Sequence, residues 1–171
     1  MGVDDAAAQR SKPMTAGAVV RFNHEYRFGV APELLWETLS RFDLYPSWWA
    51  WLRDFTATPG DTGLVAGTEL RGRVAPPLPG RLSVRVVLDN CRPGELIEAT
   101  VYGDVRGTAS LRFAPHAEGT TVTADWTLQM AKSPLRVVTL LAPPVARWAH
   151  DQVVAMAVAG FRRHALASVL G

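Results

Sequence analysis

Two histidines are the best candidates for proton transfer in this chain. His24 lies on the apolar face of an alternating segment over residues 19–28, where it would point into a protein interior. An imidazole can donate or accept a proton near neutral pH, so a histidine in a pocket could act as a general acid or base. The alternative is a core histidine that is hydrogen-bonded to a neighbour.

His150 and Asp151 stand together near the start of a predicted long helix, and a carboxylate could orient the imidazole for acid/base chemistry. Adjacent residues on a helix do not face each other, so both could instead be surface polar groups. Tyr102 could orient a ligand oxygen through its hydroxyl, or it could be a cross-strand packing residue. His24, His150 and Tyr102 are therefore the predicted catalytic residues.

The sequence contains no catalytic motif of a more specific kind. It has no Ser-His-Asp order, no glycine-rich phosphate loop, and no cluster of His and Cys at metal-ligand spacing. No metal and no cofactor are therefore predicted. Any chemistry would depend on positioning a reactive ligand in a dry cavity beside one acid/base group, as in cyclisation of a poly-β-ketone or dehydration of an aldol product.

Composition predicts one soluble domain without a nucleic-acid partner. The 171 residues are 48% hydrophobic and 20% charged, with a net charge of +2. The arginines are scattered among acidic residues and form no basic stripe. The single Cys91 cannot form an internal disulfide, and no run approaches the ~20 apolar residues that span a membrane. We expect a cytoplasmic protein with a disordered tail over residues 1–18 and one domain over 19–171; the composition leaves a homodimer open.

The order of the predicted elements is a strand, two short helices, six strands and one long helix. Residues 19–28 alternate as a strand, Pro32 begins a helix that ends near Asp43, and a second short helix begins around Tyr45 and includes Trp48, Trp49, Trp51 and Leu52. The remaining strands are predicted over 53–58, 68–74, 82–89, 96–102, 106–113 and 121–130, joined by short turns. A long helix is predicted over 145–169.

This order predicts an α+β fold in which one antiparallel sheet is covered by one helix. A sheet with an apolar face must bury that face, and only the C-terminal helix is long enough to cover it. Twisted strands would curve around that helix. Small residues on the helix, such as Ala155 and Gly160, and on the strand, such as Gly107 and Ala109, would either leave the interior hollow or let the helix and the sheet approach closely.

Several segments resemble the START-like superfamily, also called SRPBCC. The run Val30-Ala31-Pro32-Glu33-Leu34-Leu35-Trp36 resembles its "apolar-Ala-Pro-x-x-x-Trp" opening. The run Phe42-Asp43-Leu44-Tyr45-Pro46-Ser47-Trp48-Trp49 is similar to its segment with aspartate, proline and tryptophan. The segments 103–107 and 119–122 match its hairpin pattern, and 147–151 looks like the start of its closing helix. The resemblance covers about residues 19–169 and is nearest to the bacterial polyketide cyclase/dehydrase group.

The resemblance implies a helix-grip fold, in which a curved antiparallel sheet of about seven strands wraps around a long C-terminal helix, with two short helices after the first strand. It also implies an internal cavity for a polyketide, isoprenoid, quinone or lipid. The protein would be a carrier or sensor of that ligand, or a polyketide cyclase, aromatase or dehydratase. A third alternative is an interaction protein that uses an apolar patch over residues 133–141. The predicted ligand-binding residues are Phe22, Tyr26, Trp49, Arg71, Val86, Ala109, Leu111, Trp126, Leu128, Trp148, Asp151 and Met156.

Overall fold

The computed structural model describes residues 19–59, 63–75, 80–131 and 143–167. The predicted tail over 1–18 and the apolar patch over 133–141 lie outside these residues. The strands are β1 (Val19–Phe28), β2 (Leu52–Thr58), β3 (Glu69–Val74), β4 (Leu82–Arg92), β5 (Leu96–Gly103), β6 (Val105–His116) and β7 (Gly119–Met130). The helices are α1 (Pro32–Leu39), the 3-10 turn η1 (Phe42–Leu44), α2 (Tyr45–Trp48), α4 (Pro143–Gly160) and the π-helical turn η2 (Phe161–Leu166).

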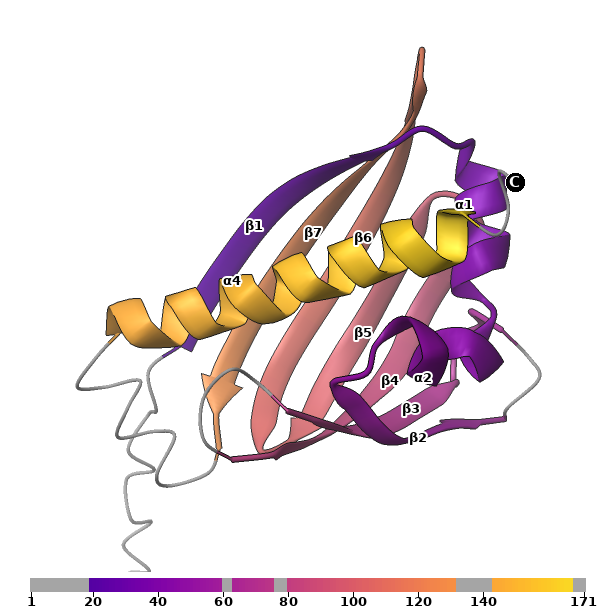
Figure 1. Cartoon of the computed structure of the whole chain (residues 1–171). Helices are drawn as coiled ribbons and strands as arrows, with labels where there is room; N and C mark the ends of the chain where they lie inside the picture. Colours follow the sequence, from indigo (N-terminus) through magenta and orange to yellow (C-terminus); the bar gives the residue numbers. More distant parts are fainter. Residues whose placement is uncertain (1–18, 60–62, 76–79, 132–142, 168–171) are drawn as a thin grey trace, which may run out of the picture.

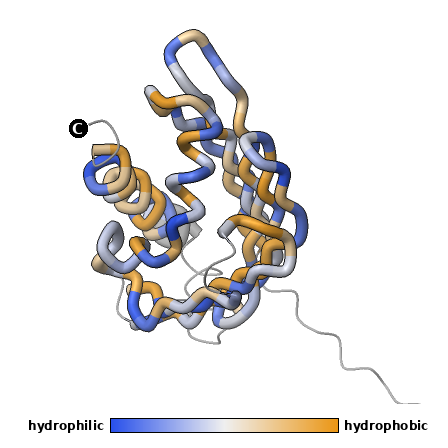
Figure 2. The backbone as a smooth tube through the Cα atoms, turned by 90° about the vertical axis from the view of Figure 1, so that its right-hand side faces the viewer, coloured by the Kyte–Doolittle hydropathy of each residue, from blue (hydrophilic) through white to orange (hydrophobic). Residues whose placement is uncertain are grey.

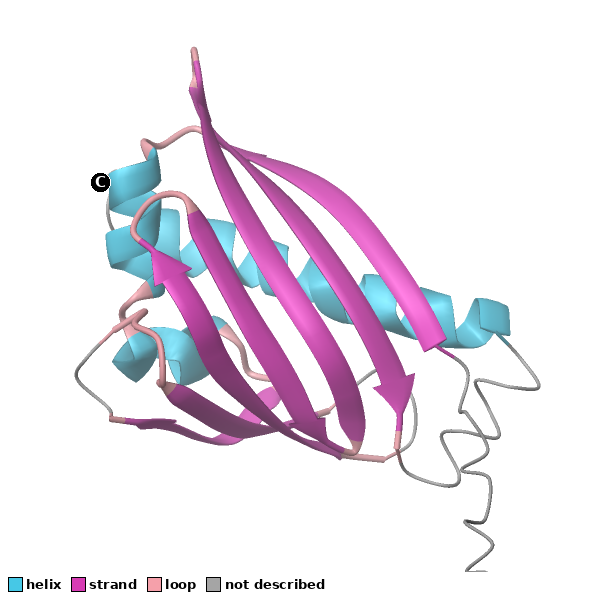
Figure 3. Ribbon diagram, turned by 180° about the vertical axis from the view of Figure 1, so that it is seen from behind, coloured by secondary structure: helices cyan, strands magenta, loops and turns pink. Residues whose placement is uncertain are grey.

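The seven strands form one antiparallel sheet in the order β1-β7-β6-β5-β4-β3-β2. This order confirms the predicted sheet, because each strand after β1 pairs with its neighbour in sequence and β1 closes against β7. Figure 1 shows α4 crossing one face of the curved sheet, while α1 and α2 lie near its C-terminal end. Figure 3, from behind, shows that none of the described helices covers the opposite face of the sheet. The helix-grip prediction is confirmed.

Hydropathy alternates along the strands (Figure 2). Because successive side chains of a strand point to opposite faces, this alternation gives the sheet an inner, apolar face toward α4 and an outer, polar face. The outer face has cross-strand polar pairs, such as Thr100 Oγ1 donating to Asp89 Oδ2 at 2.7 Å and Asn90 Nδ2 donating to Glu98 Oε2 at 3.0 Å. On the inner face, Phe28 of β1 meets Phe161 of η2 edge-to-face, with ring centroids 5.8 Å apart.

The main hydrophobic core lies where α1, α2 and η2 meet the sheet. Trp36 of α1 contacts Phe113 of β6 edge-to-face, and Trp48 of α2 contacts Phe161 in the same way. Gly160 lets α4 approach α2 closely, because a Cβ atom there would lie 2.6 Å from the backbone oxygen of Trp48. The missing side chain at Gly160 therefore lets the C-terminal end of α4 pack closely against α2.

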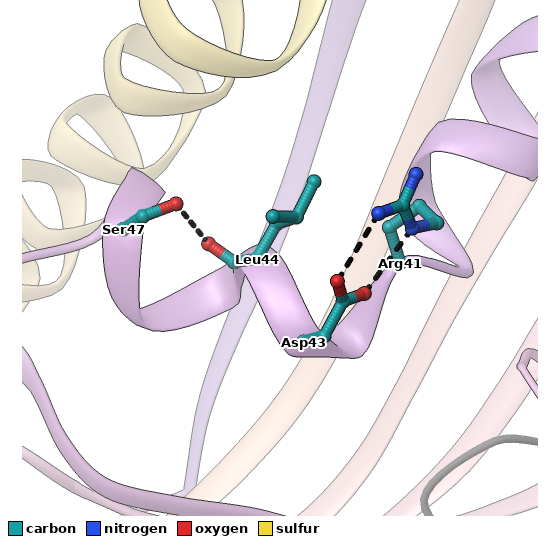
Figure 4. A network of polar contacts seen from close by, with 4 residues as sticks. All are labelled: Arg41, Asp43, Leu44 and Ser47. Carbon is teal, nitrogen blue, oxygen red and sulfur yellow. Dashed lines mark hydrogen bonds and ion pairs between the residues drawn. The ribbon is translucent and has the colours of Figure 1, made fainter.

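The second predicted helix is shorter than expected. α2 ends at Trp48, and Leu52, which was assigned to that helix, instead begins β2. Hydrogen bonds within the segment support the tight turn: Ser47 Oγ donates to the Leu44 carbonyl at 2.7 Å, and Arg41 donates twice to the Asp43 carboxylate, at 3.1 and 3.2 Å (Figure 4).

Candidate functional site

A polar cluster lies where β1 passes the N-terminal half of α4. The two-residue period of β1 puts Phe22, His24 and Tyr26 on the inner face of the sheet. From the other side, α4 contributes His150 and Asp151. Two elements from opposite ends of the chain therefore bring His24 to the pair His150 and Asp151, which the sequence analysis selected separately from it.

Asp151 lies between the two histidines. Its Oδ1 atom is 3.5 Å from His24 Nε2 and 3.6 Å from His150 Nδ1. Both distances are longer than a good hydrogen bond, so the carboxylate lies beside both imidazoles without a short hydrogen bond to either. His150 and Asp151 are adjacent on α4, yet both reach toward His24 because β1 passes directly opposite.

His150 is held between aromatic side chains. Its ring stacks on Phe22 with centroids 3.4 Å apart and 12° between the planes, and Trp126 of β7 meets it edge-on at 6.2 Å. Burial lowers the pKa of His150 and outweighs Asp151, whose negative charge raises it. Its Nδ1 atom is buried and has no hydrogen-bond partner among the described residues. The imidazole is therefore held in a fixed position and favours its neutral form.

Tyr26 extends the cluster toward the main core. Its ring lies 6.1 Å from that of His24, tilted by 32°. Burial raises the pKa of Tyr26, and the negative charge of Asp151 raises it further. A neutral phenol at this position could donate a hydrogen bond to a ligand oxygen.

Beyond His150, the inner face of the sheet forms an apolar wall. The centre of this wall consists of Val101, Val105 and Leu128, and these three side chains are buried. Its other members are only partly buried although they face α4. These are Phe22, Leu82, Val84, Val86, Ala109, Trp126 and Met130. The predicted residues Phe22, Val86, Ala109, Trp126 and Leu128 thus lie together beside the polar cluster.

Other predicted residues lie elsewhere. Trp49 and Leu111 pack against the main core, where Trp49 Nε1 donates to the Ala157 carbonyl of α4 at 2.8 Å. Tyr102 and Arg71 are on the outer face, on the side of the sheet opposite the wall. Tyr102 lies under the Arg85 guanidinium at 4.5 Å, and Arg71 pairs with Glu69.

The structure therefore does not bring Tyr102 to His24 and His150, because odd and even positions of β5 face opposite sides and Tyr102 alternates with the inward Val101. The same alternation places Arg71 outside, opposite the inward Leu70. On α4, Trp148 and Met156 are exposed, with 49% and 38% of their surface accessible.

Sequence reasoning missed that His24, His150 and Asp151 form one group. His24 and His150 are far apart in the chain, so a search for ligand spacing could not join them. It also omitted Leu82, Val84, Val101, Val105 and Met130 from the wall. Their signal was present, since Val84 and Leu82 alternate in step with the predicted Val86.

Two open depressions are formed by described residues outside this site. One lies on β3 and β4 around Arg71, Arg73 and Arg85, and the other lies between the segment after β1 and the β6–β7 turn, around Pro32 and His116. Neither depression lies between α4 and the wall. A hollow interior at that place therefore stays a prediction. Within the described part of the chain, no helix is both long and apolar enough to cross a membrane.

The curved seven-stranded sheet, the long α4 and the short helices define a helix-grip protein. The chain belongs to the family described as polyketide cyclase / dehydrase and lipid transport, whose model matches residues 19–169. The predicted resemblance is thereby confirmed. A comparison with curated proteins found no match.

Solved structures share this fold at low sequence identity. Ara h 8.0201 is 14% identical with a TM-score of 0.66, covering 88% of this chain and 99% of its own. TTHA0849 from Thermus thermophilus has the same identity, TM-score and coverage. The di-domain ARO/CYC StfQ from the steffimycin biosynthetic pathway is 19% identical with a TM-score of 0.62, covering 85% of this chain. This chain spans 48% of StfQ, about half of the di-domain protein.

Proposed function

We propose that this protein binds a hydrophobic small molecule, such as a polyketide, isoprenoid, quinone or lipid, between the apolar wall and α4. One observation carries the proposal: Phe22, Val84 and Trp126 lie on the inner face of the sheet, yet none of them is fully buried. Apolar side chains that face inward and stay accessible favour a ligand that would complete their burial. The family description and the ARO/CYC neighbour support this class of ligand.

The polar cluster would orient such a ligand. Small-molecule sites are mostly apolar, with a few polar groups that fix orientation. His24 and Tyr26 stand on the same face of β1 as Phe22, so a ligand against the wall would present its oxygens to the imidazole and the phenol. A flat aromatic ligand would also match the stacked rings of Phe22 and His150.

A filling substitution tests the binding site. Ala109 lies on the inner face of β6, so Ala109→Phe would occupy ligand space and should weaken binding of the apolar probe anilinonaphthalene sulfonate at least tenfold by fluorescence titration. Ala114→Phe is the matched control, since Ala114 lies on the same strand but is exposed on the outer face. It should bind the probe as the parent does.

Circular dichroism shows whether both variants fold. Should Ala109→Phe misfold, Val84→Phe on β4 fills the same wall from a second strand. The proposal fails if the parent does not bind the probe, or if the folded wall variants bind it as tightly as Ala114→Phe. Mass spectrometry of small molecules that co-purify with the parent from its host would identify the natural ligand.

A second candidate function is catalysis of cyclisation or dehydration on this ligand. The observation that favours it is the position of His150, stacked on Phe22 beside His24 and Asp151, where burial lowers the pKa of its imidazole. A neutral imidazole could remove a proton from a polyketide carbon, and its protonated form could return it to a departing hydroxyl. The outward position of Tyr102 removes it from this proposal.

Substitution of the histidines distinguishes catalysis from ligand transport without catalysis. His24→Gln and His150→Gln should abolish turnover of a linear poly-β-ketone while the apolar probe still binds. His164→Gln, at an exposed histidine of η2, should leave turnover unchanged. Chromatography of the products measures turnover. Equal turnover in all three variants would show that His24 and His150 do not catalyse the reaction.

A further inference from the structure

The polar cluster has the composition and spacing of a metal-binding site. His24, His150 and Asp151 each offer one ligand atom, and these three atoms lie within 4.8 Å of one another. Two imidazole nitrogens and one carboxylate oxygen suit zinc, ferrous iron and related transition metals, whereas magnesium and calcium prefer oxygen ligands alone.

The distances require only a small contraction. A tetrahedral ion with bonds of about 2.0–2.1 Å places its ligand atoms about 3.3–3.4 Å apart. The Asp151 carboxylate oxygen already lies 3.5 Å from the His24 nitrogen and 3.6 Å from the His150 nitrogen. The His24 and His150 nitrogens lie within 4.8 Å of each other, so they must move closer together to bind the same ion.

The exposure of the three side chains shows how this approach can occur. His150 is held by Phe22 and Trp126, and only 14% of its side chain is accessible. His24 and Asp151 are 38% and 52% accessible, so they can rotate toward an ion without repacking a core. One ligand is therefore fixed in advance, while two are free to adjust.

The surroundings of one ligand atom support the same site. The Nδ1 atom of His150 is buried, and none of the described residues accepts or donates a hydrogen bond to it, since the Asp151 carboxylate lies 3.6 Å away. A buried polar nitrogen without a hydrogen bond destabilises the folded state, and coordination to an ion would supply the missing interaction. This same atom is the one that faces Asp151.

We propose that His24, His150 and Asp151 bind one divalent transition-metal ion, such as Zn²⁺. Three protein ligands leave at least one coordination position open, as in catalytic rather than structural zinc sites. The inference rests only on these three side chains and does not depend on binding of a hydrophobic ligand. If both occur, the ion could coordinate an oxygen of that ligand, in place of proton transfer by the free imidazoles.

Metal titration of the untagged full chain tests this proposal. After removal of metals with a chelator, Zn²⁺ should bind at one equivalent with a micromolar or lower Kd by isothermal titration calorimetry. Co²⁺ should give the visible absorption of a cobalt ion with nitrogen and oxygen ligands. His24→Gln, His150→Gln and Asp151→Asn should each weaken Zn²⁺ binding at least tenfold and reduce the cobalt absorption.

His164→Gln is the matched control, because it removes another histidine that is exposed and lies outside the cluster. It should bind Zn²⁺ as the parent does. Asp151→Asn is nearly isosteric at an exposed position, so it keeps the test decisive if a histidine variant does not fold. The proposal is overturned if the parent binds less than one equivalent, or if folded Asp151→Asn binds zinc and cobalt as the parent does. The apolar probe reports separately on the proposed function.

Discussion

Close contacts of individual residues position the strands that build the apolar wall. Gly107 lies on the inner face of β6 with a φ of +152°, and a Cβ atom there would lie 1.9 Å from the backbone oxygen of Thr127 on β7. Backbone cannot move aside as the end of a flexible side chain can. The glycine therefore lets β6 and β7 approach each other beside Leu128 of the wall.

Gly107→Ala should consequently lower the free energy of unfolding. Gly67→Ala is the matched comparison, because Gly67 also has a positive φ, +88°, but among the described residues no atom beyond its chain neighbours lies within 4 Å of its Cβ position. Gly67→Ala should cost about 1–2 kcal/mol through backbone conformation alone. Gly107→Ala should cost about 1–3 kcal/mol more, because it adds overpacking. Equal losses in urea titrations would contradict the steric argument.

The elements could largely be predicted from sequence, because alternation of apolar and polar residues reports directly on strands. β1 begins and ends at the predicted residues. β4 and β6 extend further than predicted, to Arg92 and His116. In β4, the register shifts between Leu88 and Asn90, so the two-residue period breaks inside the strand and hides its continuation.

The site could be predicted residue by residue but not as a unit. Alternation identified His24 and Phe22 as inward-facing, yet which part of α4 passes over β1 depends on the crossing direction of the helix. That direction is set by packing far from the site, where Gly160 meets α2 and Trp49 bonds to Ala157. Helical periodicity alone does not contain this information.

The docking of α4 on α2 is therefore an element-scale contact that can be tested. In an exposed helix, alanine is more stabilising than glycine by about 1 kcal/mol, so Ala159→Gly should destabilise the protein by this amount. Gly160→Ala should also destabilise it, by about 1–3 kcal/mol, because the new Cβ would lie 2.6 Å from the Trp48 oxygen and 2.9 Å from the Trp49 ring.

Two opposite substitutions at adjacent positions are thus expected to shift Tm in the same direction. Thermal unfolding by circular dichroism measures both. A rise in Tm for Gly160→Ala would show that helix propensity outweighs the contact with α2. It would then exclude close approach as the reason for a glycine at this position.

At the scale of the whole molecule, the buried core determines how stability depends on pH. Tyr45 lies in the main core among Phe42, Trp48, Trp49 and Phe55, and its hydroxyl donates to the Leu39 carbonyl at 2.6 Å. Burial raises the pKa of Tyr45 in the folded protein, because the phenolate would lose its hydration there. The unfolded chain exposes the same phenol to water.

This difference predicts the sign of the alkaline dependence. Below about pH 10, both states hold the phenol proton and the folded state has its full stability. Above that pH, the unfolded state releases the proton while the folded state keeps it, so the free energy of unfolding falls by up to about 1.4 kcal/mol per pH unit. Tyr45→Phe should lower stability by about 1 kcal/mol at neutral pH, through the lost hydrogen bond, and should flatten this alkaline decline.

Urea titrations between pH 8 and about 11 measure the decline for the parent and for two variants. Tyr102→Phe removes an exposed tyrosine of the outer face and should keep the slope of the parent. Tyr26 is retained in all three proteins, so the difference between their slopes reports on Tyr45. If Tyr45→Phe declines as steeply as the parent, another group governs alkaline unfolding, and burial of this phenol does not contribute to it.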